Sequence, residues 1–311
     1  VEFRALGVVV IDEQHRFGVE QRAALRGKGD DPDVLVMTAT PIPRTLLLTS
    51  YGDMDVSRLD EKPPGRKPVA TRTVPLERID EVVSGVERAV SSGAQVYWVC
   101  PLVAESELLD LAAAEDRHAA LRAKFGDRAG LVHGRMAGKD KDSVMAAFAK
   151  GKLSILVSTT VIEVGVDVPN AAIMIIEHAE RFGLAQLHQL RGRVGRGAAE
   201  SSCILLYRQP LSETARARLN VMRRTDDGFV IAEEDLKLRG GGEMLGTRQS
   251  GLPGFRIASL PEHQALLEAA RDQAQLILAR DPELTGEDAE GLKLLLYLFE
   301  RDDAIKLMRA G

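Results

Sequence analysis

Short continuous runs of apolar residues recur along the chain, separated by stretches in which apolar residues return with helical spacing. The first two runs are 6–12 (LGVVVID) and 33–40 (DVLVMTAT). Runs of this kind are typical of buried strands in a parallel sheet. A polar stretch over about 16–28 and a segment from near Pro41 have the features of helices. The resulting βαβα order favours a parallel sheet covered by helices.

The same alternation resumes between Val69 and about Gln209. The helix expected over 77–92 carries an apolar stripe on one face, formed by Ile79, Val82, Val83, Val86 and Val90. Five further strands are predicted at 95–101, 130–134, 154–160, 171–179 and 201–207. We therefore expect a second α/β domain.

Pro/Gly-rich and helical segments divide the rest of the chain. Residues 61–68 (EKPPGRKP) hold three prolines beside a glycine and are predicted to be a linker. After Pro210 the pattern is helical, with expected breaks at the glycines of 238–246 and 249–255. A packed helical tail is predicted from the helical register of Leu266, Leu267, Ala270, Ala274 and Ile277. The expected domains are thus 1–60, 69–210 and 211–311.

Composition narrows the class of protein only partly. The 311 residues are 45% hydrophobic, enough for packed cores, and their formal net charge of −5 neither favours nor excludes nucleic acid. Cys100 and Cys203 both lie in apolar runs, which indicates reduced core thiols in a cytosolic protein. No apolar run approaches the length of a membrane span. Because the sequence opens VEFRALG, without Met or a signal pattern, we expect a piece of a longer protein.

Polar residues follow both N-terminal strands. Asp12 and Glu13 end the first run, where one acid can order Mg²⁺ and the other a water beside a nucleotide. An acidic surface turn is the alternative, and a zinc site is disfavoured because no third ligand has a usual spacing. Thr38 and Thr40 end the second run, and their hydroxyls either relay hydrogen bonds toward a nucleotide site or cap the following helix.

A third polar segment, 158–171, follows the strand predicted at 154–160. Polar or small residues interrupt its valines and isoleucines, which indicates a loop touching a phosphate backbone and a ribose. Helix capping and a turn before Pro169 are the alternative. The residues concerned are Thr159, Thr160, Glu163, Gly165 and Asp167.

Residues 186–197 (QLHQLRGRVGRG) are the strongest candidate for phosphate binding. Gln189, Arg193 and Arg196 are predicted to lie on one side of a short helix, where guanidinium groups bind phosphate oxygens bidentately. A solvated basic turn is the alternative. The chain contains no G-x-x-x-x-G-K-[ST] loop, and residues 134–140 have the wrong spacing for one.

Taken in order, DEQH, TAT, STTVIEVGVDVP and Q-x-x-G-R-x-x-R resemble the two-domain motor of superfamily-two helicases and translocases. Longer stretches are similar to the bacterial RecG family of branch-migration helicases, namely 12–22, 38–46, 133–136, 179–197 and 232–251. The resemblance runs from Val1 almost to the end. It implies RecA-like motor domains, the first partial and the second complete, followed by a helical hairpin.

The resemblance also implies a function. We expect part of an ATP- and Mg²⁺-dependent motor that remodels branched double-stranded DNA, such as stalled forks and Holliday junctions, in repair and recombination. Such a protein is expected to be a cytoplasmic, nucleoid-associated monomer with possible replication-fork partners. The family's wedge domain and phosphate loop have no counterpart in this sequence, so we expect the chain alone to hydrolyse little or no ATP.

Residue roles follow by position in the matching motifs. Asp12 corresponds to the acid that coordinates Mg²⁺ through water, and Glu13 to the residue that orients the attacking water. Arg196 corresponds to the arginine finger. Nucleotide-facing positions are Gln189, Arg193, Gly165 and Asp167, and DNA-contacting or coupling positions are Thr159, Thr160, Arg218, Arg239 and Gln249.

The sequence departs from the family pattern at one position, and two other functions compete with the one that the resemblance implies. Gly241 stands where many relatives have proline. The translocation motif, about 213–251, also occurs in transcription-repair coupling translocases, although the match over 232–251 favours RecG. A non-catalytic nucleic-acid-binding module is the alternative from another class.

Overall fold

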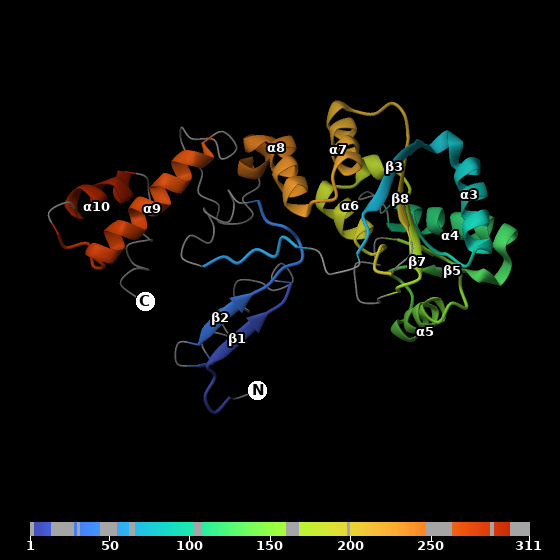
Figure 1. Ribbon diagram of the computed structural model, residues 1–311, viewed down its shortest axis with the longest axis horizontal. Helices are drawn as coiled ribbons and strands as arrows, with labels where there is room; N and C mark the ends of the chain where they lie inside the picture. Colours follow the sequence, from blue (N-terminus) through green and yellow to red (C-terminus); the bar gives the residue numbers. More distant parts are fainter. Residues whose placement is uncertain are drawn as a thin grey trace. The chain divides into compact units, whose positions relative to one another are not determined.

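The computed structural model describes most of the chain in two compact units. One unit comprises Val1–Pro43 with Arg58–Arg239, and the other Arg44–Ser57 with Gly240–Gly311. Figure 1 labels the helices and strands of both units. The described residues are 3–13, 28–29, 32–43, 55–61, 66–101, 107–159, 168–197, 200–246, 263–286 and 289–298.

The N-terminal region contains a two-stranded parallel sheet. Strand β1 (Val8–Ile11) pairs with β2 (Asp33–Val36), with Val8 opposite Asp33 and Ile11 opposite Val36. The prediction that these runs are buried strands is half wrong. Val9 and Ile11 are buried, whereas Val8 is 57% and Val10 56% exposed. Successive side chains point to opposite faces of a strand, so one face of this sheet is covered and the other is open.

Parts of the N-terminal prediction fall outside the described residues. The helix expected over about 16–28 lies almost wholly outside them, and so does the segment after Pro43. Of the predicted linker, Glu61 and residues 66–68 are described, and they form neither helix nor strand.

The main sheet has six parallel strands in the order β3-β8-β7-β4-β6-β5. Five of them match the five predicted runs. The sixth, β3, was missed because VATRTVP contains Arg72 and ends in proline, and an edge strand needs no apolar run. The strands are β3 (Val69–Pro75), β4 (Gln95–Val99), β5 (Ala129–Val132), β6 (Ile155–Ser158), β7 (Ala171–Ile176) and β8 (Ser201–Tyr207).

Helices cover both faces of this sheet. Helices α3 (Ile79–Ser91) and α4 (Glu107–Phe125) pack on one face, where they share a core with Trp98, Val157 and Ile175. On α3, Val82, Val86 and Val90 are buried, which confirms the predicted stripe. The short 3₁₀ helices Leu76–Arg78, Gly126–Arg128 and Ala179–Arg181 join neighbouring elements.

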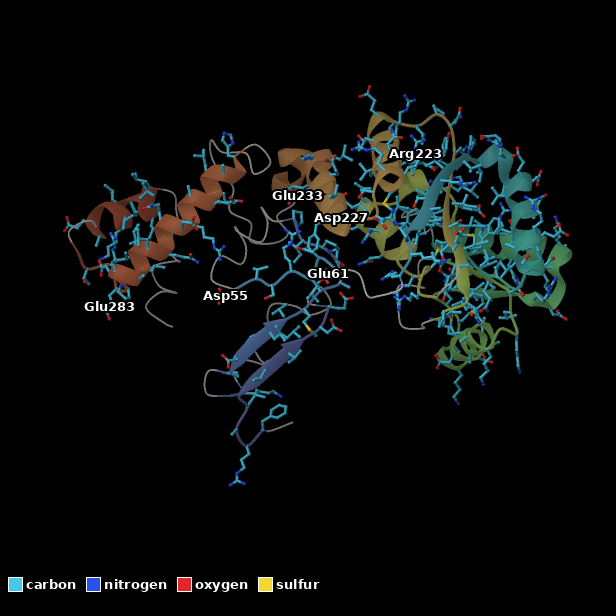
Figure 2. The ribbon with its side chains drawn as sticks, viewed as in Figure 1. Asp55, Glu61, Arg223, Asp227, Glu233 and Glu283 are labelled. Carbon is cyan, nitrogen blue, oxygen red and sulfur yellow. The ribbon has the colours of Figure 1, made fainter. Side chains whose placement is uncertain are left out.

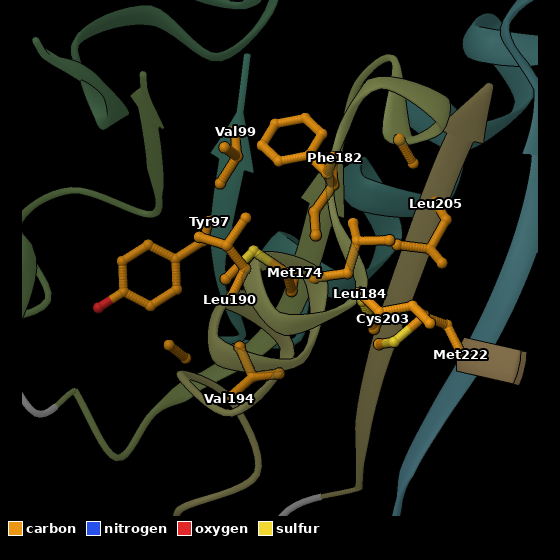
Figure 3. Close-up of a cluster of buried hydrophobic side chains, with 14 of the residues drawn as sticks. Tyr97, Val99, Met174, Phe182, Leu184, Leu190, Val194, Cys203, Leu205 and Met222 are labelled. Carbon is orange, nitrogen blue, oxygen red and sulfur yellow. The ribbon is translucent and has the colours of Figure 1, made fainter. Parts of the chain in front are cut away.

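The opposite face is covered by α5 (Gly138–Ala149), α6 (Leu184–Arg191) and α7 (Glu213–Arg224). Figure 3 shows the core on this side, where side chains of α6 and α7 meet those of the central strands. Cys203 belongs to this core and Cys100 to the other, and both are free thiols as predicted. Burial raises the pKa of Cys203 to about 12, so that thiol stays protonated at neutral pH.

Helix α8 (Gly228–Gly246) follows α7 after the short turn 225–227. The predicted helix break at 238–246 is wrong, because α8 continues through Gly240, Gly241 and Gly242. Glycine costs roughly 1 kcal/mol relative to alanine inside a helix, which weakens a helix without forbidding it. The glycine-rich segment 249–255 lies outside the described residues.

The second unit contains α9 (Gln264–Arg280) and α10 (Ala289–Leu298). The helical register predicted for the tail is confirmed, but the predicted packing is not. Leu266 is 65% exposed, and Ala270 and Ala274 are exposed as well, so this stripe does not lie against a core. Among the described helices, none combines the length and the apolarity needed to cross a membrane.

Candidate nucleotide and DNA site

Polar residues gather at the carboxyl ends of β1 and β2. Asp12 and Glu13 follow β1, and the backbone N–H of Glu13 donates to Asp12 Oδ1 at 2.9 Å. Glu13 adopts a left-handed backbone with φ 51°, a conformation that is uncommon outside glycine. Thr40 follows β2, and its N–H donates to Thr38 Oγ1 at 3.1 Å. Because the strands are parallel, both groups lie at the same edge of the sheet.

The arginine-bearing segment is a turn rather than a helix face. Helix α6 ends at Arg191, so the predicted placement of Gln189, Arg193 and Arg196 on one helical side is wrong. The glycines explain this. Gly195 has φ 78°, and a Cβ there would lie 2.8 Å from Val69 Cγ2, so only glycine fits the turn.

Backbone carbonyls hold this turn. The O of Gly192 accepts from Arg196 Nε at 3.4 Å and from Arg66 Nη2 at 3.2 Å. Arg196 remains exposed. An exposed guanidinium on a glycine-shaped turn matches the stereochemistry of phosphate oxygens.

One hydrogen bond joins the two polar segments. Gln189 Nε2, on α6, donates to Thr40 Oγ1 at 2.7 Å. The sequence placed these residues in separate motifs, and the structure brings them into contact. The Thr40 hydroxyl thus accepts a hydrogen bond from α6, and its relay role toward a nucleotide stays a prediction.

The segment after β6 is described only at its beginning. Thr159 is 3% exposed, its N–H donates to Val132 O at 3.3 Å, and its Oγ1 has no hydrogen-bond partner among the described residues. The side chains of His133 and Ser158, at the neighbouring strand ends, also hold unpaired buried atoms. Thr160, Gly165 and Asp167 lie outside the described residues.

The predicted coupling residues are only partly visible. Arg218, on α7, donates from Nη1 to Phe182 O at 2.6 Å, which fixes α7 to the segment before α6. Arg239 belongs to α8, but its side chain lies outside the described part, as does Gln249. Gly241 lies within α8, so glycine at this position is compatible with a helical backbone.

Sequence reasoning missed a buried arginine beside this site. Arg191 is 3% exposed and donates to His188 Nδ1 and to main-chain oxygens at the end of α7. Burial, reinforced by the positive charge of Arg191, lowers the pKa of His188 to about 4. A signal was present, because Arg191 follows Leu184 and Leu187 at the spacing of the buried face.

A second missed cluster lies where β7 ends. Glu177 is 7% exposed and its Oε1 accepts from Trp98 Nε1 and from Arg117 Nε, both at 2.5 Å. The Arg117 guanidinium also lies 5.6 Å from the centre of the Trp98 ring. This buried ion pair connects α4 to the centre of the sheet, and its members are far apart in sequence.

The residues present fit part of a Mg²⁺–nucleotide site. An exposed carboxylate such as Asp12 is the hard oxygen ligand that Mg²⁺ prefers, and the arginine turn fits phosphate oxygens. The sequence of 311 residues supplies no phosphate-binding loop of the G-x-x-x-x-G-K-[ST] type. The chain therefore provides acids and arginines, but not every contact that a triphosphate needs.

Two family models match the chain. Residues 76–198 match the helicase conserved C-terminal domain, and residues 225–296 match the C-terminal part of domain 3 of the ATP-dependent DNA helicase RecG. The first match covers strands β4 to β7 of the main sheet and the arginine turn. The second covers α8, α9 and most of α10.

Full-length relatives are similar over nearly the whole chain. The chain is 58% identical to the ATP-dependent DNA helicase RecG of Acidithiobacillus ferridurans and 54% identical to that of Escherichia coli K12. Each match covers 91% of this chain and 42% of the relative, so the chain spans about two fifths of these curated relatives.

A solved structure of RecG bound to a three-way DNA junction is also similar. The chain is 48% identical to it with a TM-score of 0.65, over 86% of this chain and 34% of that one. The six-stranded domain thus has the RecA-like helicase fold. The chain belongs to the RecG family of DNA helicases.

Proposed function

We propose that this chain is part of an ATP- and Mg²⁺-dependent motor that remodels branched double-stranded DNA. The observation that carries the proposal is the bond from Gln189 to Thr40, which joins the arginine-bearing segment to the strand ends that carry the acids. Membership of the RecG family supports the choice of branched DNA, since one relative's structure holds a three-way junction. Remodelling of forks and Holliday junctions in repair and recombination is part of this proposal.

In this proposal the domains divide the work. Residues 1–60 contribute the acidic half of the nucleotide site, 61–68 link the motor domains, and 69–210 contribute the arginine turn. Residues 211–311 contain α7 and α8, which we assign to coupling hydrolysis to DNA movement. The protein would act as a cytoplasmic, nucleoid-associated monomer, with replication-fork proteins as partners.

Each polar group has one chemical task. Asp12 holds Mg²⁺ through water, and Glu13 orients the water that attacks the γ-phosphate. Bound Mg²⁺ supplies neutralisation of the phosphate charge. Gln189 and Arg193 face the γ-phosphate, and Arg196 stabilises the charge that develops as the phosphoryl group transfers. Gly165 and Asp167 are assigned to the same nucleotide.

DNA contacts are assigned to the carboxyl edge of the main sheet. Thr159 follows β6, where main-chain and hydroxyl groups are suited to phosphate oxygens, and Thr160, the next residue in the sequence, is assigned to the same contact. The unpaired polar atoms of Thr159 and His133 at this edge support the assignment, because buried polar groups are normally paired. Arg218, Arg239 and Gln249 are assigned to coupling. The match of residues 225–296 favours RecG over a transcription-repair coupling translocase.

The test is removal of the finger in a full-length protein that carries this chain. Arg196→Ala is expected to lower DNA-stimulated kcat for ATP by about 10³-fold or more, because the charge of the transferring phosphoryl group loses its cation. Turnover is measured with a forked duplex under saturating Mg²⁺-ATP.

Arg122→Ala is the matched control. Arg122 is an exposed arginine near the end of α4, at the opposite edge of the sheet, and its ion pair with Asp127 is solvated. It should leave turnover unchanged. Equal turnover of Arg196→Ala and wild type would refute the finger assignment.

A further inference from the structure

Arg191 makes an unusual set of contacts for a buried cation. Its Nη1 donates to Met222 O at 2.9 Å and to Thr225 O at 2.8 Å, with Thr71 Oγ1 at 3.4 Å. Its Nη2 lies 3.2 Å from His188 Nδ1. All four of these acceptors are uncharged. The guanidinium thus joins α6 to the end of α7.

The partial charge of a helix end explains why a cation is stable there. Met222 O is one of the last carbonyls of α7, which have no partner inside the helix and carry its negative dipole end, and Thr225 O belongs to the extended residue that follows the helix. Nη1 of Arg191 donates to both of these carbonyls, while Nη2 of the same planar group lies toward His188. A lysine ammonium cannot reproduce that geometry.

His188 continues the contact to the start of α8. Because arginine only donates, His188 Nδ1 accepts and its proton lies on Nε2. That Nε2 faces Gly228, where an added Cβ would lie only 2.8 Å away. The imidazole therefore packs directly against the first residue of α8.

The turn between the two helices is itself fixed by hydrogen bonds. Thr225 Oγ1 accepts from the N–H of Asp227 at 3.1 Å, and Asp227 Oδ1 accepts from the N–H of Phe229 at 2.8 Å. Figure 2 labels Asp227 at the start of α8. Residues 225–228 thus form one ordered connection between α7 and α8. Arg191 and His188, both on α6, contact this connection.

The same short helix carries the arginine turn at its end. Arg193 follows Arg191 by two residues, after the helix cap at Gly192. A displacement of the arginine turn has to move the end of α6, and the contacts above connect that end to 225–228. Neither Arg191 nor His188 has a role in the nucleotide and DNA contacts proposed for this chain.

We propose that Arg191 and His188 are positioning residues that transmit displacement of the arginine turn to α8 through residues 225–228. The inference rests on the proposed motor function, which it deepens by identifying the connection between hydrolysis and the coupling helices. The two residues bind neither nucleotide nor DNA in this proposal.

The first test measures coupling in a full-length protein that carries this chain. For Arg191→Lys, kcat for DNA-stimulated ATP hydrolysis and KM for ATP should stay within about threefold of wild type, while base pairs unwound per ATP fall by about tenfold. Gly228→Ala, whose added Cβ would lie 2.8 Å from His188 Nε2 and 2.6 Å from Pro41 Cγ, should give the same split. Arg181→Lys, an exposed arginine ahead of α6, is the matched control and should change neither quantity.

The results separate the inference from the proposed function. Without DNA-stimulated ATP hydrolysis in wild type, the proposed function fails. With an active wild type, an unchanged yield per ATP in Arg191→Lys overturns the inference, as does a proportional loss of hydrolysis and unwinding.

A second measurement guards against a general folding defect. Hydrogen exchange in the 311-residue chain should show lost protection at amides of residues 229–238 in Arg191→Lys, with β4 and β7 protected as in wild type. Uniform loss across the sheet would show that Arg191 is only a core residue and would overturn the inference.

Discussion

Strands β1 and β4 have similar apolar sequences but different surroundings. All five residues of β4 are buried, because β4 lies between β7 and β6 and helices cover both faces. In β1 burial alternates, because that strand pairs with β2 and one face of the sheet is open. An apolar run thus identifies a strand, but the number of its covered faces depends on elements that the run does not specify.

The largest effect expected from this difference is in packing energy. Leu156 is fully buried on β6, and Leu156→Ala should lower the free energy of unfolding by about 2–5 kcal/mol. Leu35, on β2, is 53% exposed, and Leu35→Ala should cost about 0.5 kcal/mol or less. Urea unfolding of both variants is followed by the fluorescence of Trp98, the single tryptophan, which reports unfolding of the six-stranded domain.

Equal shifts of the two leucine variants would contradict the difference in packing between the two sheets. They would show that the two-stranded sheet is packed as closely as the main sheet and unfolds together with it. An unchanged midpoint for Leu35→Ala would show that the two sheets are energetically independent.

The next effect is expected from acid. The pKa of His188 is lowered from 6.5 to about 4 by burial first, then by Arg191 and Arg66, while Asp226 and Asp227 oppose the shift. The unfolded chain therefore binds the extra proton between these values. Stability should be complete above about pH 6.5 and fall toward pH 4, by up to about 3 kcal/mol from this group.

Comparison with His188→Gln isolates that contribution. The glutamine variant does not titrate at this position, so its urea midpoint, read from Trp98 fluorescence, should fall less steeply over the same pH range. Parallel curves for the two proteins would show that the imidazole is solvated and that its contact with Gly228 is not formed in solution.

The smallest effect concerns a helix cap in the packed domain. Ser212 Oγ accepts from the N–H of Ala215 at 3.2 Å at the start of α7, and Ser212→Ala should destabilise by about 1 kcal/mol. Ser84→Ala, in the middle of α3, is the control. There alanine has the higher helix propensity, so the urea midpoint should stay unchanged or rise. A drop in midpoint shared equally by both variants would contradict the assignment of the cap.

The sequence predicted most strands of the main domain and helix α3, but it missed strand β3 and the continuation of α8. Alternation of apolar runs and stripes was enough for five strands and α3, because four of these strands lie inside the sheet and the fifth, β5, is an edge strand that kept an apolar run. Strand β3 escaped because an edge strand tolerates Arg72. The glycines of 240–242 predicted a break that α8 does not have, since backbone flexibility permits a turn without requiring one.

For the candidate site, the order of the motifs identified the polar side chains but did not predict which of them contact one another. The bond from Gln189 to Thr40 and the contact of Arg117 with Glu177 join residues distant in sequence, and no local pattern encodes such pairs. The helical placement of Arg193 and Arg196 failed because closely spaced glycines end α6. Arg191 differs from these cases, because its place on the apolar face of α6 could have been predicted from the sequence.

The pairing of β3 with β8 has a consequence for synthesis of the domain. Among the described strands, the first strand of the six-stranded sheet pairs only with the last, with Val69 opposite Ser201 and Pro75 opposite Tyr207. On a ribosome the nascent chain therefore carries an unmatched strand until the final one emerges. Contacts of such long sequence separation slow folding. A chain stopped before 201 would leave that edge open to chaperones and proteases.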